Sequence, residues 1–477
     1  MLPTIAIAAL FATEADAATL QLSYAEALQR ASERNPSVRN AELDLNVADG
    51  AILAARATFE PRFNLSGTTF SSTNEGQFQF GDYNSETTGT NVSAGVEQPI
   101  ATGTAFGVTY DANQQDTTFT VKNLEQEFGE PAWDTKLAFT LSQSLLQGHR
   151  LAYNLQVVRG ARRARSVAEA QRQAIRESAL ADTARAYWGL YYAEQVEKIA
   201  LQGMDAAVGQ QRVIHALVTE GRLAGVEGTR MDAAVGQAER AVMEASAAAD
   251  AATNALLLLL GEMPGQSIEL TSPPVGPPDL TLDAEAVVEA VLSGNPDLLA
   301  LKIAADAKQA SVRDSRHALL PQLDATASYG LRGYDKTFSG STAELGAATL
   351  PEWTLGARLD LPLFNFADRG ALQQRIGEAA RAEIDVHAME GVLSQQARSQ
   401  VRTIASARRV VELARIGVSL AEQTLAAEKA NVLEGRVIQT QLTTALKDLD
   451  TARADAEKAL TDYQIAVVEL ERLKGSL

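Results

Sequence analysis

The sequence predicts an α+β protein built from two tandem copies of one helix–strand–helix unit. Three observations carry this prediction. An Asn–Pro pair is followed 26 residues later by a Pro, and the same spacing recurs at an offset of 260 residues. After each such Pro the pattern changes to the period-two alternation that is typical of strands. A helical pattern of about 70 residues without Pro then follows the strands of each copy.

Each copy begins with a short helix that a polar residue caps. Ser23 and Asp283 stand at equivalent positions, and both residue types accept hydrogen bonds from the first N–H groups of a helix. The Asn–Pro pair interrupts the helix, because the residue before Pro disfavours helical backbone. The helical pattern resumes for about 22 residues until Pro61 or Pro321 stops it.

Alternating apolar residues predict four strands within 62–145 and two within 322–363. Strands with one apolar face suit a lipid-facing barrel, but they equally suit a soluble hairpin with one face on a core, and the alternation leaves both open. The polar segments 71–90, 112–132 and 332–350 are predicted to be loops. Four aromatic residues suit a belt at a membrane interface: Tyr110, Trp133, Tyr329 and Trp353.

A long helical hairpin is predicted to end each copy, over 148–260 and 367–473. About 70 residues at 1.5 Å per residue would make the longer arm ~105 Å long. A Glu–Gly–Arg sequence breaks each hairpin, and Gly221 and Gly435 suit the left-handed conformation of the turn. The Pro-rich segment 271–280 is predicted to link the two copies.

The first repeat therefore covers 19–270 and the second covers 281–477. Residues 1–18 are predicted to be a signal peptide, because a short apolar segment ends there in small residues. The sequence has no run of about 18 apolar residues, so we expect no membrane-spanning helix.

The composition excludes several classes of protein. Lys and Arg number 42 against 60 Asp and Glu, and the net charge of −18 argues against a nucleic-acid binder. Cysteine is absent and the four His are far apart, so no metal or thiol centre is expected. No nucleophile–base spacing or Gly-rich phosphate loop stands out, and we therefore predict no enzyme and no cofactor.

This ordered set of features, occurring twice, resembles the TolC-like outer-membrane efflux protein family. The carrying motifs are the two Asn–Pro helices, the changes from Pro to strand, the Gly tips, and the segment 358–364 that enters the second long helix. The resemblance implies a homotrimer whose strands form one outer-membrane β-barrel, continued by a long periplasmic α-helical barrel. It places the protein in the outer membrane of a Gram-negative bacterium, extending into the periplasm.

The resemblance also implies a function. The protein would be the passive export duct of a tripartite efflux or type I secretion system. Its partners would be a periplasmic adaptor protein, an inner-membrane transporter of the RND or ABC type, and outer-membrane lipid. A periplasmic or surface scaffold or adhesion protein without a channel is the alternative. The transported substrate and the particular pump and adaptor stay open.

The number of strands departs from the family pattern. Family members give four strands per chain, whereas this sequence predicts six. A trimer would then close an 18-stranded barrel, unless the extra hairpin near 89–113 folds over or into a 12-stranded one. Above about 16 strands a barrel encloses an open aqueous channel.

The resemblance places the constriction of the duct at the hairpin tips. In the family, carboxylates just after the second tip Gly can line it and bind cations. Thr440 and Thr443 stand at those positions here, so the acidic ring is missing. Arg222 and Arg436 either donate hydrogen bonds that hold the helices together or are solvated. The candidate tip residues are Gly221, Arg222, Glu227, Gly435, Arg436, Gln439, Thr440 and Thr443.

Four arginines cluster at the start of the first long helix, just after the strands. Such runs are usually solvated, and contact with inner-leaflet head groups is the alternative. These residues are Arg159, Arg162, Arg163 and Arg165.

Overall fold

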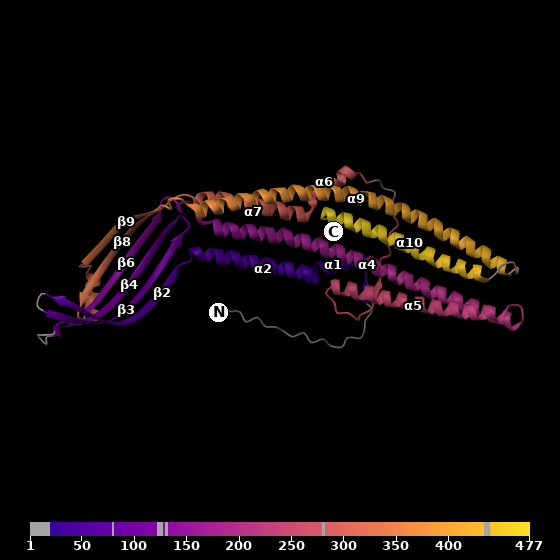
Figure 1. Cartoon of the computed structure of the whole chain (residues 1–477), viewed down its shortest axis with the longest axis horizontal. Coiled ribbons are helices and arrows are strands. Elements are labelled where there is room, and N and C mark those ends of the chain that lie inside the picture. Colours follow the sequence, from indigo (N-terminus) through magenta and orange to yellow (C-terminus); the bar gives the residue numbers. More distant parts are fainter. Residues whose placement is uncertain are drawn as a thin grey trace. The chain divides into compact units, whose positions relative to one another are not determined.

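The computed structural model describes residues 20–78, 81–121, 127–128, 132–278, 282–348, 350–433 and 439–477 (Figure 1). The predicted signal peptide lies outside these residues. The chain divides into two compact units. We call Asn46–Ser166 with Ile303–Ile384 the sheet unit, and we call Met1–Leu45, Val167–Lys302 and Asp385–Leu477 the hairpin unit.

The order of elements repeats along the chain. The first repeat contains β1 (Leu20–Leu22), α1 (Tyr24–Arg34), α2 (Pro36–Arg56), a short 3₁₀ turn (Ala57–Phe59), β2 (Arg62–Phe78), β3 (Gly81–Ile100), β4 (Thr104–Val121), β5 (Glu127–Phe128), β6 (Ala132–Ser144), α3 (Leu151–Asn154), α4 (Gln156–Thr219), α5 (Gly225–Leu259) and β7 (Ile268–Leu270). The second contains α6 (Ala284–Gly294), α7 (Pro296–Ala318), β8 (Gln322–Asp335), α8 (Phe338–Ala347), β9 (Leu350–Asp360), α9 (Phe366–Leu433) and α10 (Gln439–Lys474).

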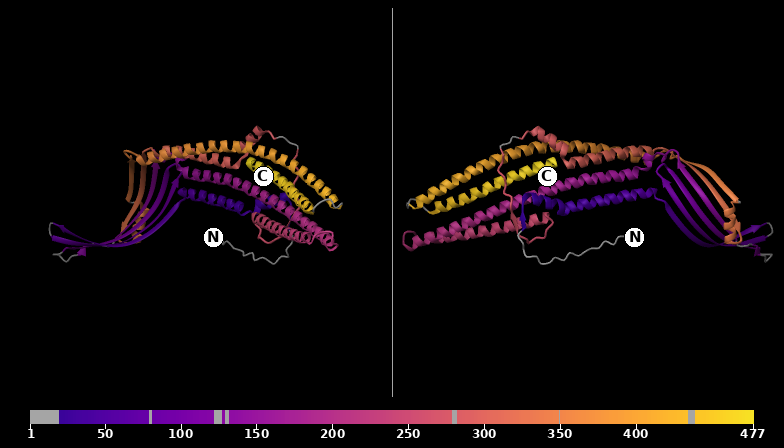
Figure 2. Two further views of the ribbon diagram at one scale, coloured as in Figure 1. Left: turned by 45° about the vertical axis from the view of Figure 1, so that its right-hand side comes forward. Right: turned by 180° about the vertical axis from the view of Figure 1, so that it is seen from behind.

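One antiparallel sheet dominates the sheet unit. Its path is β2-β3-β4-β6-β8-β9, with the short β5 paired to β4 outside this path. Figures 1 and 2 show the long strands as a single curved layer. β2 and β9 form the two edges, and each leaves one row of backbone groups unpaired within this chain.

Two of the predicted loops, 71–90 and 112–132, are wrong over most of their length. β2, β3 and β4 are 17, 20 and 18 residues long, and they pair with one another out to Phe78↔Gly81 and Tyr83↔Val121. The polar composition suggested loops, but many of these residues are Thr, which favours strands. Thr87 and Thr117 lie opposite each other, with their hydroxyl oxygens 3.3 Å apart.

The third predicted loop, 332–350, contains α8. The side chain of Thr337 accepts a hydrogen bond from the Gly340 N–H at 3.1 Å and so begins the helix. α8 packs on β6 and β8, where Leu345 is buried. The backbone of Ser341 lies so close to Gly333 that a side chain at Gly333 would collide with the Ser341 carbonyl oxygen.

The starts of α1 and α6 are capped as predicted from the sequence. Ser23 and Glu26 form a capping box, in which each side chain bonds the backbone N–H of the other residue. The Asp283 side chain accepts from the Glu285 N–H at 3.2 Å. Asn35 and Asn295 end these helices, and Pro36 and Pro296 begin the next ones.

Among the described residues of the hairpin unit, the two larger apolar cores are each built mainly from one repeat. In the first, Tyr24 stacks on Trp188 with ring centroids 5.1 Å apart, and Tyr187 is fully buried. In the second, residues of α6, α9 and α10 pack around Leu393 and Val411. β1 and β7 pair in parallel beside the first core.

One described helix, α5, is long and apolar enough by composition to cross a membrane, although none was predicted. Its most apolar window has a mean hydropathy of 1.2. Alanine dominates this helix, and α5 pairs with α4 through the bond from Gln211 to Asp232, 2.8 Å long. These features suit a helix of a packed hairpin.

Candidate functional site

One face of the sheet is apolar across its six long strands. Phe63 and Trp353, at the two edges, are 69% and 73% exposed. Isolated soluble chains rarely expose an apolar face of this extent, whereas contact with lipid requires one. The register aligns one row of this face across all six strands: Phe63, Val96, Val108, Phe139, Tyr329 and Trp353.

The opposite face is polar and hollowed. Arg62, Glu97, Gly107, Thr140 and Ser328 form a register row on this face. These residues also line a cavity of about 460 Å³, so the polar face lies on the concave side of the sheet. A barrel that continued this curvature would enclose the polar face and turn the apolar face outward.

Four charged residues form a network on the polar face of β6, β8 and β9. Arg332 donates to both carboxylate oxygens of Asp134, at 2.8 and 2.6 Å. Lys136 lies 2.7 Å from Glu352, and Arg332 lies 3.8 Å from the same carboxylate. Two positive and two negative charges balance here, so this network orders the wall without giving it a net sign.

The four aromatic residues predicted for a membrane belt all lie on the apolar face, but they do not all lie on one register row, that is, at one height along the strands. Tyr329 and Trp353 are direct partners in the register, and Tyr110 lies on the row next to theirs. Trp133 packs edge-to-face against Phe338 of α8, with ring centroids 5.0 Å apart. The belt stays a prediction.

The first hairpin tip is a glycine turn between α4 and α5. Gly221 has a φ of +74°, and the Arg222 N–H donates to the Leu217 carbonyl at 2.9 Å, which closes the last turn of α4. The exposed Arg222 side chain lies 3.6 Å from Glu220, and Glu227 pairs with Arg230 at 2.7 Å. Both ion pairs are local to the tip, so a bond from Arg222 that holds helices together stays a prediction.

The second tip is described only in part. Gly435 and Arg436 lie outside the described residues. Gln439 and Thr440 begin α10, and Thr443 is half-buried in its second turn. Below them, Leu425 of α9 and Leu442 of α10 are buried in a small apolar core. The gate assigned to these residues from the sequence stays a prediction.

A polar contact near the first tip was missed in the sequence. Asp232 of α5 accepts from Gln211 and lies 2.8 Å from His215 Nε2 of α4. These bonds lower the pKa of the Asp232 carboxyl, with the His215 bond as the larger cause. Only the register of the hairpin brings these residues together, and no local motif marks them.

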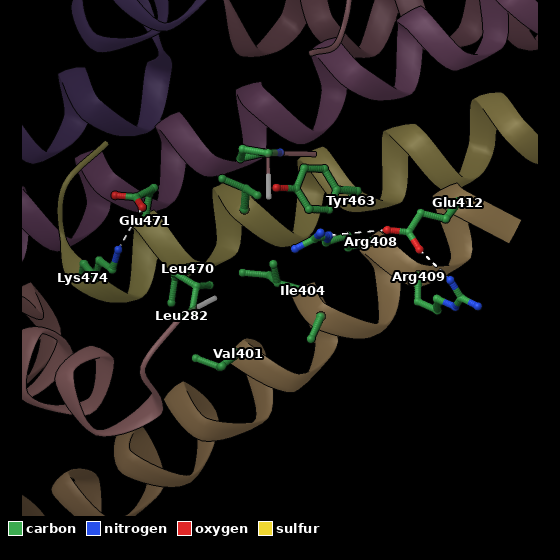
Figure 3. Close-up of a pocket in the computed structure, with 13 residues that line it drawn as sticks. Leu282, Val401, Ile404, Arg408, Arg409, Glu412, Tyr463, Leu470, Glu471 and Lys474 are labelled. Atoms are coloured by element: carbon green, nitrogen blue, oxygen red, sulfur yellow. Dashed lines mark hydrogen bonds and ion pairs between the residues drawn. The ribbon is translucent and has the colours of Figure 1, made fainter. Parts of the chain in front are cut away.

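A cavity of about 520 Å³ lies between α9 and α10 in the hairpin unit (Figure 3). Ile404 and Tyr463 are among its apolar lining residues. Its labelled charges are paired: Glu412 lies 3.7 Å from Arg408 and 2.7 Å from Arg409, and Lys474 lies 3.0 Å from Glu471. The cavity therefore presents no charge without a partner among these side chains. None of its residues stood out in the sequence.

Within the described parts of the chain, no group of three or more His, Asp or Glu residues could hold a metal ion.

Comparison with known proteins identifies the family of proteins to which this two-faced sheet and these helical hairpins belong. The model of the family described as "Outer membrane efflux protein" matches residues 27–130 and 287–476. The chain belongs to the outer membrane efflux protein family. The two matched segments fall in the two repeats.

Named relatives agree with this family. The chain is 25% identical over 358 residues to the outer membrane efflux protein BepC of Brucella suis, covering 72% of this chain and 70% of BepC. Its fold is similar to the CmeC outer membrane channel of Campylobacter jejuni, with a TM-score of 0.72, 13% identity, and coverage of 95% and 85% of the two chains. The outer membrane protein VceC of Vibrio cholerae gives a TM-score of 0.66 at 16% identity, covering 95% of this chain and 96% of VceC.

The fold class expected from the sequence is confirmed: an outer-membrane β-barrel with a periplasmic α-helical barrel, formed by a trimer of two-repeat chains. The efflux channel resides in the outer membrane and extends into the periplasm. It serves as the outer-membrane duct of a tripartite system that also contains an adaptor and an inner-membrane pump. The family consists of channels rather than enzymes.

Proposed function

We propose that the polar face of the sheet lines the outer-membrane pore and that the hairpin tips form the constriction at its periplasmic entrance. The first part rests on the sheet, whose six long strands have one apolar and one polar face and whose concave side is polar. Lipid covers the apolar face, and water and substrate pass along the polar one. The chain supplies no energy for transport, and an inner-membrane transporter of the RND or ABC type delivers substrate through the adaptor.

The two sheet edges support a barrel of 18 strands. β2 and β9 are far apart in the strand order, so β2 of one chain pairs with β9 of the next and the rotation closes after three chains. β3 pairs with β2 from Gly81 to Glu97, and β4 pairs with β6 from Thr104 to Gln115, so β3 and β4 cannot fold away without losing these register pairs. An 18-stranded barrel is wide enough to hold an open aqueous channel.

Cross-linking tests this closure. The chain has no native cysteine, so single cysteines along β9 can be combined with single cysteines along β2 and, in a parallel set, along β4. Disulfide-linked trimers are expected from one set of staggered pairs. Links from β9 to β4 instead of β2 would mean that the extra strands leave the barrel wall, and would overturn the 18-stranded closure.

The missing acids at the second tip predict how the constriction behaves. Thr440 and Thr443 give no ring of carboxylates, so cations have no strong site there. Single-channel conductance of the detergent-extracted trimer in a planar bilayer tests this, comparing the wild type with Thr440→Asp. The substitution is expected to make the channel more cation-selective and sensitive to block by multivalent cations added from the tip side. Unchanged selectivity and no block would place the constriction elsewhere.

A further inference from the structure

A small cavity of about 230 Å³ in the sheet unit is lined by an unusual excess of positive charge. α3, α4 and α7 meet at this cavity, and four guanidinium groups border it against one carboxylate. The charged and polar residues that matter are Arg150, Arg159, Arg163, Arg313, Asp314 and His317.

The single carboxylate does not neutralise this cluster. Asp314 lies 3.7 Å from Arg159 and 3.7 Å from Arg163, which is long for a charge-assisted hydrogen bond. Within the described ranges, Arg150 and Arg313 form no ion pair or side-chain hydrogen bond. The cavity therefore carries a net charge of about three positive units before any ligand is bound.

Two buried nitrogen atoms of the same cluster have no hydrogen-bond partner. They are Arg159 Nε and His317 Nε2. A buried donor without a partner is costly, and an oxygen-rich anion would satisfy it. Burial, followed by the charges of Arg150 and His149, lowers the pKa of His317. The neutral imidazole can still donate one hydrogen bond from Nε2, while the arginines supply the charge.

The cavity lies at the helix end of the sheet. Asn154 of α3 donates to the Ala101 carbonyl, in the turn between β3 and β4, at 2.9 Å. The Gln147 N–H donates to the carbonyl of Pro321, the residue before β8, at 3.1 Å. The strands cross the outer membrane, so the cavity stands at the level of its periplasmic surface. Leu151 is 53% exposed directly after Arg150, and Leu320 is 39% exposed three residues after His317.

We propose that this arginine pocket binds the phosphate group of an anionic phospholipid in the periplasmic leaflet of the outer membrane. One guanidinium group can donate two parallel hydrogen bonds to the oxygens of a phosphate group. Four guanidinium groups around one cavity therefore provide more donors than a single contact with a head group at the surface uses. The exposed leucines beside the pocket provide apolar surface for the acyl chains. Free phosphate presents the same oxygens but lacks the chains, so the two sources can be separated.

Native mass spectrometry of the delipidated trimer in a neutral detergent tests the pocket. The probes are phosphatidylglycerol, phosphatidylcholine and inorganic phosphate. The double variant Arg150→Gln/Arg313→Gln removes the two arginines without ion pairs and leaves the Asp314 pairs intact. Arg162→Gln is the control, because Arg162 is exposed on α4 beside Arg163 and does not line the cavity.

The expected result is saturable phosphatidylglycerol binding by the wild type and by Arg162→Gln, weakened at least ten-fold in the double variant. Phosphatidylcholine is expected to bind at least ten-fold more weakly than phosphatidylglycerol. Equal phosphatidylglycerol binding by the double variant and the wild type would overturn the proposal. Inorganic phosphate that binds as tightly as phosphatidylglycerol would overturn the lipid as the ligand. Thermal unfolding of each variant in detergent alone shows whether it is folded.

Discussion

The side-chain amide of Asn295 donates to the carbonyl of Leu473 at 3.0 Å, and so joins the break between α6 and α7 to the last turn of α10. The first repeat contains the same bond, from Asn35 to Leu259 at 2.8 Å. Both asparagines are buried and also accept from an N–H at the start of the next helix. Each side chain therefore caps the start of one helix and donates a hydrogen bond to an unpaired carbonyl at the end of another.

Replacing either asparagine by alanine should destabilise the hairpin unit. Asn35→Ala and Asn295→Ala each leave a helix-end carbonyl and a first-turn N–H without their partner, which costs about 1–2 kcal/mol. Thermal unfolding of the detergent-solubilised trimer measures the loss. Asn46→Ala, an exposed position on α2, is the control and should change the midpoint little. Equal midpoints for all three variants would contradict the capping role.

A glycine follows the end of α5 and the end of α10, and each glycine lies beside one of these asparagines. Gly475 has a φ of +70°, and a Cβ atom there would lie 2.6 Å from the Gly294 carbonyl oxygen. Gly475→Ala should therefore cost about 2 kcal/mol through backbone strain and collision. Gly377→Ala, inside α9 at a position where an added Cβ atom meets nothing within 4 Å, should be neutral or stabilising. The same unfolding assay checks both, and a harmless Gly475→Ala would show that the helix end can rearrange.

Glu194 of α4 gives the hairpin unit a pH-dependent stability. Burial, followed by Glu197 and Glu269, raises the pKa of Glu194 to about 7. Between the unfolded pKa near 4.5 and about 7 the folded chain holds a proton that the unfolded chain has released, so stability falls as pH rises through this window.

The variant Glu194→Gln removes this ionisation. It should nearly equal the wild type near pH 4, where Glu194 is largely protonated in both the folded and the unfolded chain, and be more stable by roughly 1 kcal/mol at pH 8, after allowance for partial exposure. Calorimetry at the two pH values measures the difference. A stability difference between variant and wild type that is as large at pH 4 as at pH 8 would mean that packing, not charge, explains the effect.

Asp232 ties the two arms of the first hairpin together near its tip. If the tips form the constriction, Asp232→Ala should loosen this hairpin and raise the open probability of single channels several-fold. Glu239→Ala, at an exposed position further along α5, is the control. The same open probability in both variants would remove the first hairpin from the gate.

Local sequence signals predicted the repeat, the caps and the helix breaks, because each depends on neighbouring residues. Ser23, Asp283 and the Asn–Pro pairs act where their types suggest. Polarity could not predict where β2, β3 and β4 end. Polar, Thr-rich segments have the composition of loops, and only their pairing with neighbouring strands distinguishes them as strands. Arg159 and His317 lie far apart in sequence, and only the packing of α4 against α7 brings them to one cavity.

Cysteine accessibility tests the central claim, that the polar face lines the pore, most directly. In the cysteine-free chain, Thr140→Cys places a thiol on the polar face, and Phe139→Cys places one on the apolar face of the same strand. A charged, water-soluble thiol reagent is added during single-channel recording in a planar bilayer. Stepwise loss of conductance at Thr140→Cys, with no change at Phe139→Cys, is predicted. Block at Phe139→Cys alone would contradict the assignment of the two faces.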